Sequence, residues 1–206
     1  TETHEGLLVY YISTFEAEKA NKIAKVMMMN NHFSNSNLKW NYNSLQTAEN
    51  NGVIITHGDL DAIPKWVLQY GAGIRTDVLV VNKWLLSDDD KYRAEVFKRL
   101  GIKDLDKKQK DYKDAVFYIN DLMAHVLKNS KSPAYIGCGT DISFFKEYGI
   151  EDKMYLVGTC FRYSENNVDN LALVIKNFEQ VYDLEYLFNN FFFSTTVLRY
   201  FINELI

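Results

Sequence analysis

Residues 53–81 read VIITHGDLDAIPKWVLQYGAGIRTDVLVV, two short apolar runs around a polar turn and a helix-like segment. The runs Val53–Thr56 and Val78–Val81 are rich in β-branched residues and lack polar alternation, which is typical of strands covered on both faces. Ile63–Tyr70 favours a helix, because Pro64 stands in its first turn and glycines follow its end. Two buried strands joined by one helix predict a β-α-β unit with parallel strands and a right-handed crossover.

The same alternation continues toward the C-terminus. Strands are predicted over Ala134–Cys138 and Tyr155–Phe161, with a short helix over Ile142–Tyr148 between them. Longer helices are predicted over Tyr92–Leu100 and Tyr112–Asn129. The pattern predicts an α/β fold, a Rossmann-like three-layer domain with a mostly parallel central sheet.

The N-terminal part has helical signals. Leu7–Ile12 is an apolar run that fits either a strand or the start of a helix, and Ser13 with Glu16 forms a capping-box pattern for a helix after it. A further helix begins near Leu38 and is expected to stop near Asn51, a residue type that tolerates the left-handed conformation.

Length and composition indicate a folded, soluble chain. Apolar residues make up 47% of it and charged residues 24%, and it has two prolines and no low-complexity linker. We therefore predict a single domain over residues 1–206, with helical flanks at about 1–51 and 170–206. The chain starts without Met or a signal peptide, so we expect a piece of a longer protein.

The charge and hydropathy patterns argue against a nucleic acid partner and against a membrane span. The net charge is −4, and the scattered Lys and Arg residues form no basic stripe for phosphates, so we expect no nucleic acid partner. No apolar run approaches the roughly 20 residues that cross a bilayer, so we expect no membrane span.

The polar turn after the first predicted strand is the main candidate site. His57, Asp59 and Asp61 follow the carboxyl end of a strand, where open α/β sheets place their ligands. The two carboxylates can hold a divalent cation (Mg, Mn or Ca), and His57 can serve as a ligand or general base. The alternative is structural: either Asp caps the helix that begins near Ile63. No other cofactor is expected.

Three further features bear on a site. Arg75, before the second strand, can bind an anionic ligand or pair with Asp77. Gly137–Asp141 is a strand-to-helix turn that permits close backbone approach, but it lacks the phosphate-binding and dinucleotide-binding patterns. Arg162, after Cys160 at a strand end, is a candidate for lining the same ligand cleft as the polar turn.

The two cysteines leave two readings open. Cys138 and Cys160 lie on predicted successive strands, where they are either two buried free thiols or, in an oxidising compartment, a disulfide.

Residues 52–86 carry a family resemblance through Gly58, Asp59, Asp61, Pro64, Trp66, Gln69, Gly73, Arg75, Thr76, Asp77, Val80, Val81 and Asn82. The stretch resembles the C-terminal soluble region of multi-spanning membrane proteins of Bacteroidetes, whose membrane part is related to protein O-mannosyltransferases. Looser similarity extends over residues 38–162. The family carries an Asp-Asn-Asp-Thr-Phe-Pro motif, from which Leu60, Ala62 and Ile63 depart. These departures remove polar side chains that a metal or ligand site would use.

The resemblance implies an exported domain, in the periplasm or cell envelope, that is associated with protein glycosylation. Sugar transfer in that family belongs to the membrane part, so we expect a non-catalytic accessory domain that binds a glycan, an acceptor polypeptide or an envelope partner protein. The alternative is a metal-dependent transferase or hydrolase that uses Asp59 and Asp61. A third hypothesis is an interaction scaffold with an exposed apolar groove near Phe188–Phe193.

Overall fold

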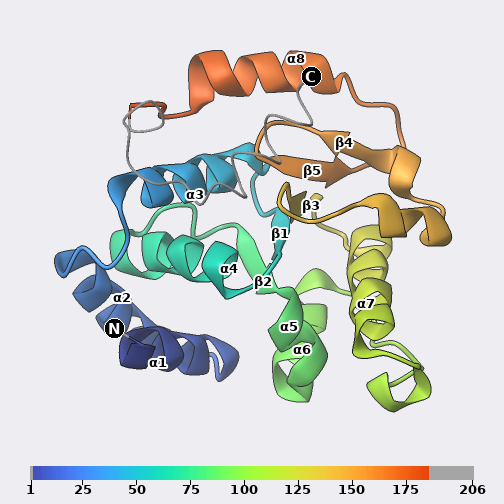
Figure 1. Cartoon of the computed structure of the whole chain (residues 1–206), viewed down its shortest axis with the longest axis horizontal. Helices are drawn as coiled ribbons and strands as arrows, with labels where there is room; N and C mark the ends of the chain where they lie inside the picture. Colours follow the sequence, from blue (N-terminus) through green and yellow to red (C-terminus); the bar gives the residue numbers. More distant parts are fainter. Residues whose placement is uncertain (1, 186–206) are drawn as a thin grey trace.

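The computed structural model describes residues 2–185, in which helices surround a five-stranded sheet (Figure 1). The strand order is β2-β1-β3-β5-β4. Strands β2, β1 and β3 are parallel, whereas β5 is antiparallel to both β3 and β4. The strands are β1 Val53–Thr56, β2 Leu79–Asn82, β3 Ala134–Gly137, β4 Met154–Leu156 and β5 Cys160–Tyr163. The α/β class is thus confirmed, with a mixed sheet.

The β-α-β unit forms as the sequence predicts. All four residues of β1 are buried, and β1 lies between β2 and β3. The strand β2 begins one residue later than predicted, and Val53 pairs with Leu79. Between the strands lie α4, Asp59–Trp66, and a π-helical turn, Val67–Gly71. The helix therefore begins four residues before Ile63, so the polar turn is already its first turn.

The predicted strand Tyr155–Phe161 is wrong, because the chain reverses inside it. Strands β4 and β5 are joined at Val157–Thr159, where Gly158 has φ of +127°, a conformation that residues with a Cβ atom rarely adopt. The Tyr182 hydroxyl occupies the space in which a Cβ atom at this position would stand. The reversal makes β5 antiparallel, so the sheet is mixed instead of mostly parallel.

The N-terminal flank consists of three helices: α1 Glu2–Ser13, α2 Ala17–Met29 and α3 Asn35–Thr47. Leu7–Ile12 is thus helical. The predicted capping box is wrong, because Ser13 ends α1 and its hydroxyl donates to the Tyr10 carbonyl. Helix α3 ends before its predicted stop, although Asn51 does adopt a left-handed φ of +59°.

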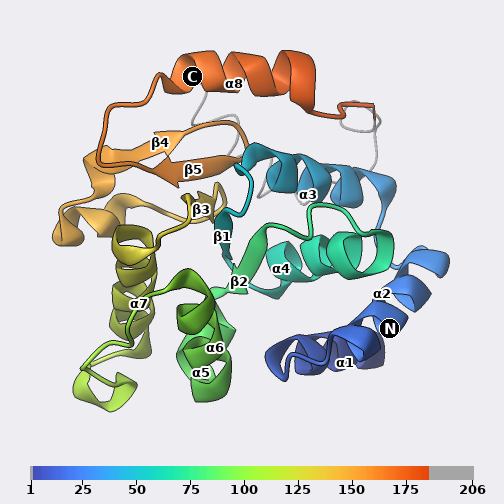
Figure 2. The ribbon, with the colours of Figure 1, turned by 180° about the vertical axis from the view of Figure 1, so that it is seen from behind.

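The remaining helices cover the sheet and its ends (Figures 1 and 2). Helix α4 contacts β1 and β2, α7 contacts β3, and α8 contacts β4. The helices that follow β2 are α5 Lys83–Asp88, α6 Asp90–Leu100, α7 Ala115–Asn129 and α8 Asn170–Lys176. Short 3-10 turns lie at Gln109–Asp111, Ser143–Tyr148 and Glu151–Lys153, and a π turn lies at Asn177–Val181. No helix among residues 2–185 has the length and apolar character that crossing a bilayer requires.

The chain returns to α3 at the end of the described residues. The Tyr182 hydroxyl lies 2.5 Å from the Thr47 hydroxyl and accepts a hydrogen bond from the Thr159 amide at 3.1 Å. Asp183 exchanges two hydrogen bonds with the Asn43 side chain, of 2.8 and 2.9 Å. These contacts join α3 to the β4–β5 hairpin. The predicted helix beyond residue 185 and the predicted groove at Phe188–Phe193 lie outside the described residues.

Candidate functional site

The carboxyl ends of the three parallel strands form the candidate site. The chain passes from β1 to β2 on one side and then to β3 on the other side of β1. Open α/β sheets bind ligands at such a reversal of strand order. Three segments meet there: His57–Asp61 after β1, Asn82–Trp84 after β2 and Gly137–Asp141 after β3. We call this surface the carboxyl-end face.

Asp61 lies on the β3 side of this face. Its Oδ2 accepts a hydrogen bond from the His57 amide at 3.2 Å, and its Oδ1 forms an ion pair with Lys65 one helical turn away. The Lys65 side chain is fully buried, and its Nζ also donates to Asn41 Oδ1 at 2.8 Å. A Cβ atom at Gly137 would lie 2.8 Å from Asp61 Oδ2. Asp61 therefore compensates a buried charge and fills the junction of β1 and β3.

Asp59 lies on the β2 side instead. Its Oδ1 accepts a hydrogen bond from Asn82 Nδ2 at 2.7 Å. The Oδ1 atom of Asn82 accepts from the Trp84 amide at 2.9 Å, which caps α5. The Trp84 indole packs against Gly58, and 44% of the residue's surface is exposed. The buried Asn82 side chain (1% exposed) thus links Asp59 to Trp84, and both of these residues are exposed.

His57 and Lys83 bridge the two strand ends. Lys83 Nζ lies 3.2 Å from His57 Nδ1 and 5.3 Å from the centre of the Trp84 ring. Burial, and then the Lys83 charge, lower the pKa of His57 below its ordinary value of 6.5. Burial also lowers the pKa of Lys83. The imidazole is therefore neutral at pH 7, and its Nδ1 can accept the Lys83 hydrogen bond.

The turn after β3 contributes a hydroxyl. Thr140 is 5% exposed, and its Oγ1 is buried without a hydrogen-bond partner among residues 2–185. The Thr140 amide donates to the Gly137 carbonyl at 3.0 Å, which closes the turn beside Asp61.

The two cysteines are free thiols. Burial raises the pKa of Cys138 to about 12 and that of Cys160 to about 11. Neither thiol has the lowered pKa of a nucleophile.

The structure does not bring the two predicted arginines to this face. Arg75 pairs with Asp77 and donates to the carbonyls of Leu45, Ala48 and Glu49, at and after the last turn of α3. Arg162 pairs with the Glu49 side chain at 2.6 Å. Because β5 runs antiparallel, Arg162 lies opposite Tyr135, toward the amino ends of β1 and β3. Both arginines support the segment that leads into β1.

The two candidate metal ligands have different partners. Asp59 binds Asn82 and Asp61 binds Lys65, on opposite sides of β1. Within residues 2–185, no group of three His, Cys, Asp or Glu side chains is arranged to hold a metal ion. The structural alternative holds in part. Gly58, not an aspartate, is the N-cap residue of α4, but Asp59 and Asp61 lie in the first turn of that helix, where carboxylates complement the helix dipole.

Sequence reasoning missed four residues of this region: Lys65, Asn82, Lys83 and Trp84. One signal was available. Lys65 follows Asp61 by four residues on one helix, a spacing that places two side chains together. The sequence marked Asn82 through the family resemblance alone and did not mark Lys83 or Trp84, because the role of these residues depends on β2 pairing with β1.

Comparison with known protein families places part of the chain beside a described domain. The family described as TMEM260-associated domain 2 matches residues 38–98, which include most of α3, all of β1, α4, β2 and α5, and most of α6. This is a domain of unknown function linked to TMEM260, a protein classed with the O-mannosyltransferases. The match ends before β3, so the similarity expected for the later strands lies outside it. No curated protein and no solved structure matches the chain.

Proposed function

We propose that this chain is a non-catalytic accessory domain, associated with protein glycosylation, that binds a glycan on its carboxyl-end face. The observation that carries the proposal is the exposed pair of Asp59 and Trp84, which the buried Asn82 side chain links. We further propose that the domain acts in the periplasm or cell envelope, and that it presents a Rossmann-like arrangement to its ligand.

The chemistry of this surface suits a sugar. The exposed Asp59 carboxylate, held by a 2.7 Å hydrogen bond from the buried Asn82 amide, presents acceptors to the hydroxyl groups of a sugar. The exposed indole of Trp84 offers a flat apolar face with a polar edge. Lys83, whose Nζ lies 5.3 Å from the centre of the Trp84 ring, supplies a donor nearby.

The matched segment supports the glycosylation context. Residues 38–98 contain His57, Asp59, Asp61, Asn82 and Trp84, and therefore two of the three loops of the face. The family's link to an O-mannosyltransferase makes glycans and glycosylated polypeptides the ligands to test first.

A glycan array probed with the labelled protein, followed by calorimetry on the hits, tests the proposal. We expect binding that Asp59→Ala and Trp84→Ala each weaken about tenfold, as expected for a lost hydrogen bond to charge and a lost aromatic contact. Phe117→Ala is the matched control, because Phe117 is similarly exposed (49%) but lies on α7.

Three outcomes contradict the proposal. Binding of acceptor peptides without glycans would replace it with polypeptide recognition, and turnover of a glycosyl donor by the purified chain would replace it with catalysis. Heat on titration with Mg²⁺, Mn²⁺ or Ca²⁺ that Asp59→Ala abolishes would favour the metal-dependent alternative.

A further inference from the structure

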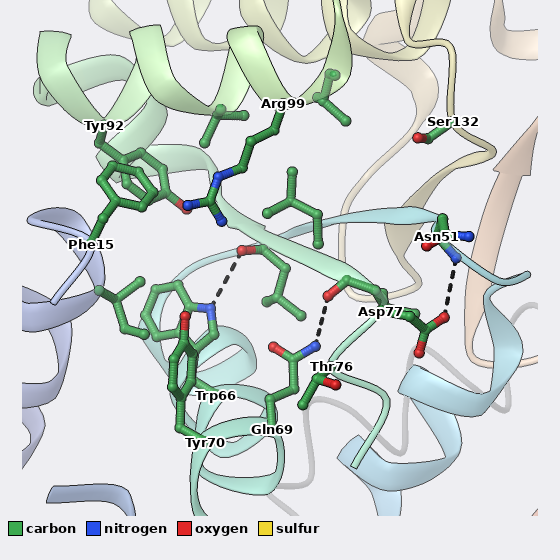
Figure 3. Close-up of a pocket in the computed structure, with 16 residues that line it drawn as sticks. Phe15, Asn51, Trp66, Gln69, Tyr70, Thr76, Asp77, Tyr92, Arg99 and Ser132 are labelled. Atoms are coloured by element: carbon green, nitrogen blue, oxygen red, sulfur yellow. Dashed lines mark hydrogen bonds between the residues drawn. The ribbon is translucent and has the colours of Figure 1, made fainter. Parts of the chain in front are cut away.

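A second site lies along the outer edge of β2, apart from the carboxyl-end face. A cavity of about 410 Å³ is bounded there by residues of α1, α4 with its π turn, β2 and α6. Figure 3 shows its aromatic walls, which come from Phe15, Trp66, Tyr70 and Tyr92. Its volume falls within the range of sites for small molecules, which are mostly apolar with a few placed polar groups.

The walls are fixed by hydrogen bonds to the strand edge. Leu79 directs its amide to Gly52 beside β1, so the alternate residues of β2 direct their backbone groups outward. Gln69 Nε2 donates to the Val78 carbonyl at 2.7 Å, and Trp66 Nε1 lies 3.4 Å from the Val80 carbonyl. These side chains cap the free edge of the sheet. The cavity is therefore preformed.

One end of the cavity is cationic. Figure 3 shows the Arg99 guanidinium directed into the cavity beside Tyr92. Its carbon lies 4.7 Å from the centre of the Phe15 ring, and its Nε donates to Glu95 at 3.0 Å. Among residues 2–185, no group accepts a hydrogen bond from its two Nη atoms or from the Tyr70 hydroxyl. These donors remain for a ligand.

The other end is polar without free charge. Asn51, Thr76 and Ser132 line it, and the Asp77 carboxylate there is already bound by Arg75 and the Asn51 amide. Buried apolar side chains, such as Val80 and Val96, also line the cavity.

We propose that this cavity binds a small organic anion, with its carboxylate, sulfonate or phosphate group paired to Arg99 and its apolar or aromatic body between Trp66 and Val96. The guanidinium is positioned for a bidentate contact, and the Tyr70 hydroxyl can donate to the same group. The opposite end accepts a hydroxyl or amide substituent. This site is separate from the face proposed for the glycan.

Two fluorescent probes of related shape test the assignment on the whole chain. One is 8-anilinonaphthalene-1-sulfonate, and the other is N-phenyl-1-naphthylamine, which lacks the anionic group. Arg99→Met should lower the affinity for the sulfonate probe about tenfold and change the affinity for the neutral probe less than about twofold. Lys98→Met is the matched control, because Lys98 lies on the same helix, 80% exposed, and also pairs with Glu95. It should leave both affinities unchanged.

A blocking variant locates the binding. Thr76→Trp fills the polar rim and should weaken both probes at least tenfold, with circular dichroism confirming that the variant folds. If Arg99→Met and Lys98→Met lower the affinity for the sulfonate probe equally, Arg99 does not bind the anionic group and the proposal fails. It fails too if a folded Thr76→Trp variant binds both probes as the unmodified chain does.

Discussion

Lys65 and Asp61 form an ion pair in which the ammonium side chain is fully buried and the carboxylate is 24% exposed. A buried charge that loses its partner is strongly destabilising, whereas replacing both partners by apolar groups costs little. We therefore expect Asp61→Ala to lower the free energy of unfolding by about 3 kcal/mol, and Asp59→Ala, which leaves this pair intact, by no more than about 1 kcal/mol. Urea denaturation measures both values.

A double variant separates the buried charge from other effects of the substitution. Adding Lys65→Met to Asp61→Ala should recover part of the lost stability, because the unpaired ammonium is then gone. If the double variant loses as much stability as the two single variants together, the unpaired Lys65 ammonium is not the cause of the loss in Asp61→Ala.

Gly137 and Gly139 make a second matched test. A Cβ atom at Gly137 would press on Asp61 Oδ2, and the Asp61 carboxylate is held in place by Lys65 at Oδ1 and by the His57 amide at Oδ2. Nothing lies within 4 Å of a Cβ atom at Gly139. Gly137→Ala should cost about 1–2 kcal/mol and Gly139→Ala less than about 0.5 kcal/mol by urea denaturation. Equal losses of stability in the two variants would mean that the Asp61 side chain can move away from a Cβ atom at position 137 without cost.

The His57–Lys83 contact predicts a pH dependence. Because burial and Lys83 lower the pKa of His57 below 6.5, the unfolded chain binds more protons than the folded chain just below that pH. Stability should therefore fall as the pH drops through 6.5 toward the folded-state pKa. Between about pH 7.5 and pH 5.5, unfolding free energies of the unmodified chain should fall more than those of His57→Gln.

An NMR titration tests the assigned cause. Lys83→Met removes the neighbouring cation, so the pKa of His57 should rise toward its ordinary value. A pKa that stays where it was would show that Lys83 has no part in the shift.

The cysteines should be inert in the folded chain. With pKa values raised to about 12 for Cys138 and about 11 for Cys160, almost no thiolate forms at mildly alkaline pH. Mass spectrometry after iodoacetamide treatment should show no adduct on the folded chain and two adducts after unfolding in denaturant without reductant. An absence of adducts after unfolding would indicate a disulfide.

The sequence predicted those parts of the fold that local patterns encode. Val53–Thr56 and Ala134–Cys138 were found as strands because buried parallel strands are continuous apolar runs. The β4–β5 reversal was missed, since only Gly158 marks it and its tight contact is with the distant Tyr182. The grouping of His57 with Asp59 and Asp61 was local and therefore predictable. The partners Lys83 and Asn82 arrive through strand pairing, which no short pattern records.

The contacts of Tyr182 and Asp183 with α3 also constrain how the chain reaches this structure. Thr47 and Asn43 must wait for residues about 140 positions later before their hydrogen bonds can form. Contacts of such sequence separation slow folding, because a long loop must close before they contribute. During translation the helices and the first strand pair can assemble early, and the hairpin can then contact α3 through Thr159 and Cys160. The hydrogen bonds from Tyr182 and Asp183 form only when nearly the whole described chain has left the ribosome.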